Sequence, residues 1–252
     1  MNTFLHRYEL DQSAPTGKAA RRDIAVRVLL PAVALWLVIV GVGLLITGPL
    51  DNLPGEQAVN EWFESIRTPA LNSVTAVLSA IGTTEFIIGG CLLFVALFWW
   101  RTKQWWLAIV PPQAIAVQAI VFMTAALVVG RERPEVEHLD ESPPTSSYPS
   151  GHTGASTAFY VTLAMMAQRI SHPVLRGVVT VLCLLIPLGV GTARLYRGMH
   201  SPTDVLMGFV NGLVCAFLAW NYLRRDTSGA AQQGDARSAS TRGTDDRPAQ
   251  VA

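Results

Sequence analysis

The sequence predicts an all-helical integral membrane protein whose core is a six-transmembrane-helix bundle. Half of its 252 residues are hydrophobic and only 15% are charged, an excess of apolar side chains that needs a lipid solvent. Several apolar stretches reach about 18 residues, the length at which a helix crosses the hydrocarbon core of a bilayer. The formal net charge is +1, so we expect no nucleic acid partner.

The first span is predicted near residues 26–48. It follows Arg21, Arg22 and Arg27, but its apolar stretch is too long for a signal peptide and it lacks a clear small-residue cleavage site. We therefore interpret it as an uncleaved transmembrane helix.

The second span, near residues 72–100, is the least regular of the six. Gly82, Thr83 and Thr84 interrupt its apolar run, so we expect a short tilted helix at the membrane interface to precede the true crossing. The other four spans are predicted near residues 104–128, 152–170, 174–193 and 203–222.

The composition changes at both ends of this apolar region. Residues 1–25 are polar and mixed, and residues 226–252 are rich in Ser, Gly, Ala, Asp and Arg without apolar periodicity. Both are predicted to be disordered. The membrane domain is accordingly expected to occupy residues 26–225.

The basic residues predict the orientation, because Lys and Arg near span ends are retained in the cytoplasm. In a six-span arrangement one side holds most of them: Arg21, Arg22, Arg27, Arg101, Lys103, Arg169, Arg176, Arg224 and Arg225. We expect a multi-pass plasma membrane protein with both termini in the cytoplasm. The loops 49–70, 129–151 and 194–202 then face the extracytoplasmic side.

Three polar clusters fall in these outward loops and in the helix starts beside them. They are Gly130-Arg131-Glu132-Arg133-Pro134, Tyr148-Pro149-Ser150-Gly151-His152, and Ala193-Arg194 followed by His200 and Asp204. Together they offer fixed cations, two histidines and a carboxylate. These groups can bind a phosphoryl group, attack it and protonate the leaving oxygen.

The clusters resemble the signatures of the type 2 phosphatidic acid phosphatase superfamily, whose fold is shared with vanadium haloperoxidases and bacterial acid phosphatases. Those signatures read K-x6-R-P, P-S-G-H and S-R-x5-H-x3-D. The second is intact here as Pro149 to His152, and the third has Ala193 in place of Ser. The first retains Arg133-Pro134, but its Lys position is Ala126. The resemblance covers roughly residues 30–222 and implies an acid phosphatase/vanadium haloperoxidase-like core.

The resemblance implies that His200 is the nucleophile and forms a phosphohistidine. Asp204 then orients and polarises the His200 imidazole, and His152 protonates the leaving oxygen before it activates water. The local sequence agrees, because Pro202 suits the first turn of a helix on which Asp204 lies one turn from His200. Asp204 could instead be only the acidic member of a capping box with Ser201.

The expected phosphate ligands are Arg133, Arg194, Ser150 and the backbone N–H of Gly151, because guanidinium groups and helix starts both bind phosphate. Arg131 is the nearest substitute for the Lys that is missing at Ala126. Purely structural roles stay open as alternatives to phosphate binding. Ser150 could be only a helix N-cap, and the arginines could be anchors at the membrane interface.

No metal or other cofactor is expected, since no cluster has metal-ligand spacing. The acidic residues of the 129–151 loop are interpreted as a solvated surface: Glu135, Glu137, Asp140 and Glu141.

The predicted function is a membrane lipid phosphatase, and the predicted partners are a lipid phosphate and the bilayer. Polyprenyl diphosphate, phosphatidic acid, phosphatidylglycerol phosphate and a phosphorylated sugar on a polyprenyl carrier all stay open as substrates. A lipid phosphotransferase and a non-catalytic anionic-lipid binding or transport protein are the alternatives, and the oligomeric state is left open.

Overall fold

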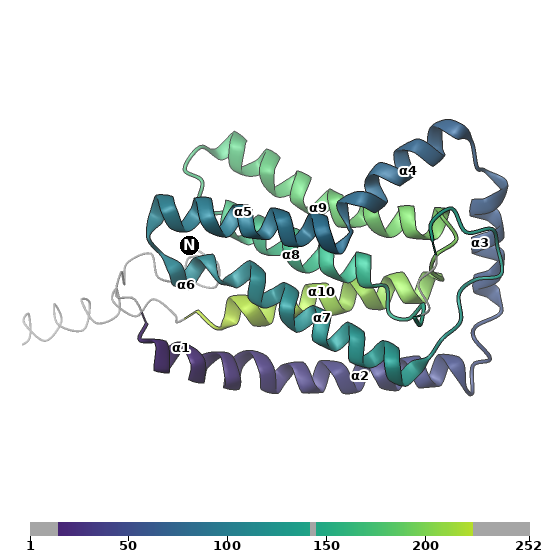
Figure 1. Ribbon diagram of the computed structural model, residues 1–252, viewed down its shortest axis with the longest axis horizontal. Coiled ribbons are helices and arrows are strands. Elements are labelled where there is room, and N and C mark those ends of the chain that lie inside the picture. The colour runs from purple at the N-terminus through teal and green to yellow at the C-terminus, as the bar shows by residue number, and fades with distance from the viewer. Residues whose placement is uncertain (1–14, 142–144, 224–252) are drawn as a thin grey trace, which may run out of the picture.

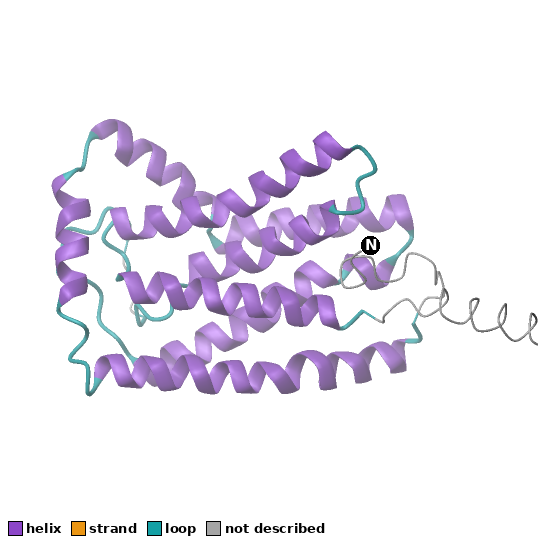
Figure 2. Ribbon diagram, turned by 180° about the vertical axis from the view of Figure 1, so that it is seen from behind, coloured by secondary structure: helices purple, strands orange, loops and turns teal. Residues whose placement is uncertain are grey.

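The computed structural model describes residues 15–141 and 145–223. Over this part of the chain every regular element is a helix (Figure 2). The elements are α1 (Gly17–Ile24), the π-helical turn η1 (Ala25–Leu29), α2 (Leu30–Thr47), α3 (Gly55–Ser65), α4 (Pro69–Ile81), α5 (Thr84–Thr102), α6 (Trp105–Ala108), α7 (Val110–Val129), α8 (Gly151–Ala167), α9 (Pro173–Tyr196) and α10 (Pro202–Asn221).

The long helices lie side by side in a bundle (Figure 1). The start of α1 and the end of α10 lie at one end of the bundle, and the loops that precede α8 and α10 lie at the opposite end. All three polar clusters are therefore at the end away from the start of α1 and the end of α10. Many large apolar side chains point outward, such as Leu92 and Leu127, as expected for a bundle whose solvent is lipid.

The predicted spans match these helices, including the predicted break in the second span, with two differences. The first helix begins at Gly17, so part of the segment that we predicted as disordered is helical. The second predicted span is broken between α4 and α5, as the interruption near Gly82 suggested. Within the described residues, five helices are long and apolar enough to cross a membrane. Helix α8, with 17 residues, is shorter than those five, so the count of six stays a prediction. The predicted tails at 1–14 and 224–252 lie outside the described residues.

Close contact between α8 and α10 forms the centre of the bundle. A Cβ atom on Gly208 would lie 2.7 Å from the Ser150 carbonyl oxygen, and one on Gly212 would lie 2.5 Å from the Gly154 carbonyl oxygen. Only glycine permits this approach, which is how helices pack closely inside membranes. The backbone N–H of Ser150 also donates to the carbonyl of Asp204 at 2.9 Å. The starts of the two helices, which carry His152 and Asp204, are thereby tied together.

The loop between α7 and α8 is anchored at both ends. Helix α7 ends at Gly130, whose φ of 63° is the left-handed conformation that terminates helices. At the far end, the Tyr148 side chain is fully buried and its hydroxyl donates to the Ile39 carbonyl of α2 at 2.8 Å. The loop is thus held against the bundle, with its Ser147 carbonyl close to His200.

Candidate active site

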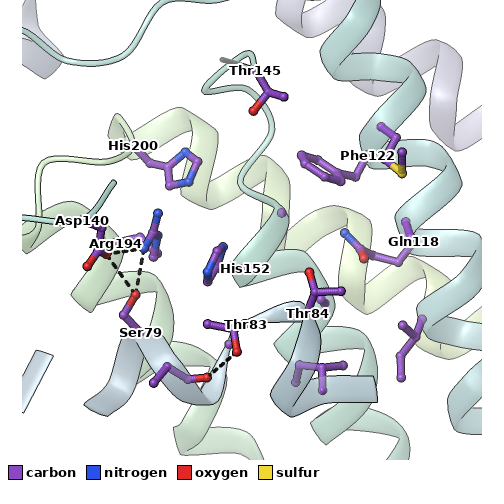
Figure 3. A pocket seen from close by; sticks show the side chains of 18 of the residues that line it. Ser79, Thr83, Thr84, Gln118, Phe122, Asp140, Thr145, His152, Arg194 and His200 are labelled. Atoms are coloured by element: carbon purple, nitrogen blue, oxygen red, sulfur yellow. Dashed lines mark hydrogen bonds and ion pairs between the residues drawn. The ribbon is translucent and has the colours of Figure 1, made fainter. Parts of the chain in front are cut away.

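The two histidines and two of the arginines of the polar clusters meet at one cavity of about 530 Å³. His152, His200, Arg133 and Arg194 all line it, and Figure 3 shows the two imidazoles and Arg194 grouped at one end. His152 comes from the start of α8, Arg194 from the end of α9, and His200 from the turn before α10. Three separate helix ends therefore supply one site.

The His200 ring is buried, and its hydrogen bond fixes its tautomer. Nδ1 lies 2.7 Å from the carbonyl oxygen of Ser147. A carbonyl can only accept, so Nδ1 carries the proton and Nε2 keeps its lone pair. Burial lowers the pKa of His200 below its ordinary value, and Asp204 offsets only part of that effect. Neutral His200 is thus favoured, with the basic nitrogen that a nucleophile requires.

Asp204 is fully buried beside this ring and has two roles. Its Oδ2 lies 3.8 Å from Nδ1 of His200, which is beyond hydrogen-bonding distance, so the carboxylate acts on the imidazole through its charge. The same oxygen accepts the backbone N–H of Ser201 at 2.8 Å. Asp204 therefore makes the capping bond and can also polarise the ring through its charge, whereas the hydrogen bond that orients the ring comes from the Ser147 carbonyl.

Arg194 is positioned by its Nη1 atom. That atom donates to Asp140 at 2.7 Å and to the Ser79 hydroxyl at 2.8 Å (Figure 3). Its buried Nε has no hydrogen-bond partner among the described residues. The side of the guanidinium that carries Nε is the side that binds oxyanions with two parallel hydrogen bonds. Arg194 is therefore held in place with donor capacity still available for phosphate.

Arg133 also lines the cavity and contacts the residue before His200. Its Nη1 donates to the carbonyl of Met199, the residue before His200, at 2.7 Å. Burial lowers the pKa of Arg133, and the charge of Asp204 offsets part of this effect. Arginine nevertheless stays protonated in proteins. The cavity therefore has a second fixed cation next to the histidine pair.

The chain is similar to a known family over much of its second half. Residues 112–228, which carry all three clusters, match the PAP2 (type 2 phosphatidic acid phosphatase) superfamily model. The chain therefore carries a PAP2 superfamily domain over these residues. It is 28% identical over 174 residues to phosphatidylglycerophosphatase B of Bacillus subtilis, which covers 65% of this chain and 80% of the relative.

Two solved structures have a similar fold. One is the transmembrane PAP2-type phosphatidylglycerolphosphate phosphatase from Bacillus subtilis, with a TM-score of 0.65, 23% identity, and coverage of 75% of this chain and 92% of that one. The other is Aquifex aeolicus LpxE, with a TM-score of 0.50, 20% identity, and coverage of 64% and 92%. At these identities, the two structures show only that the fold is similar.

The PAP2 site departs from the prediction at Arg131, which does not line the cavity. Its guanidinium contacts Asp204 at Oδ1, whereas the His200 ring is beside Oδ2. Nη1 donates to Asp204 Oδ1 at 2.6 Å, and Nη2 donates to Glu56 at 2.8 Å. It also donates to Thr203 and to the carbonyl of Asn52. Burial by itself lowers the pKa of Arg131, but Asp204 and Glu56 outweigh burial and the net pKa is raised. We therefore assign Arg131 to the support of Asp204 rather than to the place of the missing Lys.

The P-S-G-H motif contributes through its backbone. Ser150 is fully buried, does not line the cavity, and pairs its hydroxyl with that of Thr153 at 2.9 Å. It is the N-cap of α8, so the capping alternative describes its side chain. Gly151 does line the cavity, and a Cβ atom there would lie 2.8 Å from the Phe122 ring. The start of α8, where the helix dipole favours an anion, thus forms part of the cavity wall.

Asp140 was misinterpreted from the sequence as part of a solvated loop. It lines the cavity and accepts from Arg194 and from Arg197, with the Arg197 Nη2 atom at 2.6 Å. Burial acts to raise the pKa of Asp140, but the two arginines outweigh it and the net pKa is lowered. The other acidic residues of the loop, Glu135, Glu137 and Glu141, are exposed, so no pattern in the sequence set Asp140 apart from them. Among the described residues, no group of His, Cys, Asp and Glu side chains is arranged to hold a metal ion.

Proposed function

We propose that this chain is a membrane lipid phosphatase that hydrolyses a phosphate monoester or diphosphate on a lipid carrier through a phosphohistidine intermediate. The observation that carries the proposal is the His200 ring. Its Nδ1 is fixed by the Ser147 carbonyl, and its ring lines a cavity shared with Arg133, Arg194 and His152. The PAP2 family and the phosphatase relatives add support for the class of reaction.

The proposed reaction has two balanced steps. In the first, Nε2 of His200 attacks phosphorus, the bond from phosphorus to the lipid oxygen breaks, and protonated His152 gives its proton to that oxygen. In the second, neutral His152 takes a proton from water, whose oxygen attacks the phosphohistidine and releases inorganic phosphate. Arg133 and Arg194 hold the non-bridging oxygens in both steps and stabilise the charge of the transition state.

The position of the site supports a lipid substrate. The cavity is at the end of the bundle, and it extends between α5 and α7, two helices that are apolar and long enough to span a membrane. A ligand with an acyl or prenyl tail can therefore keep its tail in the bilayer while its phosphate reaches the histidines. The charge distribution of the sequence supports an extracytoplasmic site and cytoplasmic termini. Phosphatidylglycerol phosphate, the substrate class in the names of two relatives, is one candidate.

The test measures phosphate release by purified protein in detergent across a panel of lipid phosphates, with and without EDTA. We expect release that EDTA does not change, and that His200→Ala abolishes. His172→Asn is the matched control, because His172 caps the start of α9 and asparagine can make the same cap.

The alternative functions give different results in the same assay. Full activity of His200→Ala removes the nucleophile assignment. Lipid binding without phosphate release favours a transport or binding protein. Release only when a second lipid acceptor is present favours phosphotransfer. Trapping of labelled phosphate on the wild type, but not on His200→Ala, tests the intermediate directly.

A further inference from the structure

The cavity has an apolar arm that leads away from the histidines between α5 and α7. The side chains along it are aliphatic or aromatic for the most part: Ile87, Ile88, Ile115, Ala119, Phe122 and Met123. Ile88 and Met123 are exposed on the outside of the bundle, at 48% and 61%. The arm therefore continues to the surface that faces lipid, as expected for the path of a hydrocarbon chain.

One amide group lies in this apolar arm. Gln118 of α7 lines the cavity, is only 1% exposed, and its Nε2 has no hydrogen-bond partner among the described residues (Figure 3). A buried donor without a partner is costly, more so in a membrane, where no water replaces the missing bond. Gln113 on the same helix is also unpaired, but it does not line the cavity. Of the two glutamines, Gln118 is the one placed where a bound ligand can satisfy it.

The Gln118 amide packs directly against the backbone of α8 at Gly154. A Cβ atom on Gly154 would lie 2.3 Å from Nε2 of Gln118, so any larger residue at 154 would displace the amide. Gly154 and His152 lie on different faces of α8, but His152 and Gln118 both line the one cavity. A lipid that places its phosphate at the histidines and its tail in the apolar arm therefore has the Gln118 side chain in the wall beside it.

We propose that the Gln118 amide donates a hydrogen bond to an ester carbonyl oxygen of the substrate, so that this site selects glycerolipid phosphates over polyprenyl phosphates. The inference rests on the proposed phosphatase function. In a glycerolipid an ester carbonyl follows the phosphate oxygen after a few bonds, whereas a polyprenyl chain has only hydrocarbon there. The last torsion angle of glutamine is soft, so the Nε2 atom can turn from Gly154 toward the carbonyl without a change of the backbone.

The test compares three substrates in one detergent: a diester phosphatidic acid, its diether analogue without carbonyl groups, and a polyprenyl monophosphate. The variants are Gln118→Met, which keeps the shape but removes the donor, and Gln113→Met as the matched control. We expect the wild type to prefer the diester to the diether by about tenfold in kcat/KM, the factor that one hydrogen bond in a dry site supplies. Gln118→Met should lose that preference and keep its activity on the polyprenyl phosphate, and Gln113→Met should resemble the wild type.

The possible results are distinct. Equal rates of the wild type on diester and diether overturn the inference without any variant, so a poorly folded Gln118→Met does not block the test. A diester preference that survives in Gln118→Met also overturns it. Failure of the wild type to release phosphate from these three lipids and from every other lipid phosphate of the panel described above refutes the proposed function itself.

Discussion

Replacing Arg131 with Met tests whether Asp204 depends on a buried cation. Arg131 is paired with Asp204 and Glu56, whose side chains are 0% and 12% exposed. Removal of one partner of a buried ion pair costs about 3–5 kcal/mol, because the other charge is left uncompensated. Glu56 can reach water, so we expect the lower end. A loss of about 3 kcal/mol lowers the unfolding midpoint by roughly 6–12 °C.

The kinetic effect should differ from the loss of a phosphate ligand. Without Arg131, Asp204 loses the partner of Oδ1 and is free to move relative to His200. A small misplacement of a catalytic group can reduce the rate about 100-fold, and we expect this loss in kcat with KM little changed. The pKa of His200 should also rise, because the negative charge of Asp204 is no longer balanced. The acid limb of kcat/KM then moves to higher pH.

The control is Arg67→Met. Arg67 is another arginine with a largely buried guanidinium, and it donates to the Tyr196 carbonyl, but it contacts neither histidine nor Asp204. Its replacement should lower the unfolding midpoint without moving the acid limb. A large rise in KM for Arg131→Met, with normal thermal stability and an unchanged acid limb, refutes this reasoning and restores Arg131 as a phosphate ligand.

Two further predictions concern the same site. The pKa of His200 is lowered by burial, so His200 stays neutral below its ordinary pKa of about 6.5. The acid limb of kcat/KM should therefore lie below that pH. The lipid phosphate also titrates, and its own pKa is measured by phosphorus NMR so that the two titrations can be separated. The same shift makes folding stability decline as pH falls from about 6.5 toward the folded pKa, since the unfolded chain binds the proton first, and His200→Ala should remove that part of the decline in thermal unfolding. Ala126→Lys restores the cation of the first motif and should raise kcat/KM by about tenfold or more. Ala126→Met is the control for side-chain volume. If lysine brings no gain, another group already supplies this contact.

The sequence predicted well what depends on helix periodicity and on motif spacing. The long apolar runs became α2, α5, α7, α9 and α10, and the break at Gly82 separates α4 from α5. His152 and Asp204 each lie near a helix start that Ser or Pro marks in the sequence. Their proximity follows from the glycines that let α8 and α10 approach, which a single sequence does not reveal.

The ion pairs around the site could not be predicted from the sequence, because their partners lie far apart in the chain. Arg131 meets Glu56 because the turn before α3 holds Asp51, Asn52 and Leu53 at positive φ, and no glycine there signalled such a turn. The same turn presents the Asn52 carbonyl to Arg131 at 2.8 Å. Side chains paired across 75 residues have no periodic relation, so the spacing of charges along the chain does not predict them.

The charges around the phosphate cavity explain why the missing Lys matters. Arg131 is matched by Asp204 and Glu56, while Arg194 and Arg197 share Asp140. With Arg133 the paired network has four arginines and three carboxylates, 4 − 3 = 1, and the exposed Glu141 also lines the cavity. A bound phosphate therefore meets at most one net positive charge from these groups, besides the proton that His152 carries in the proposed reaction. A lysine at position 126 would add one more, and because the attraction to a cation grows with the charge of the anion, we expect the dianion to gain more from Ala126→Lys than the monoanion does.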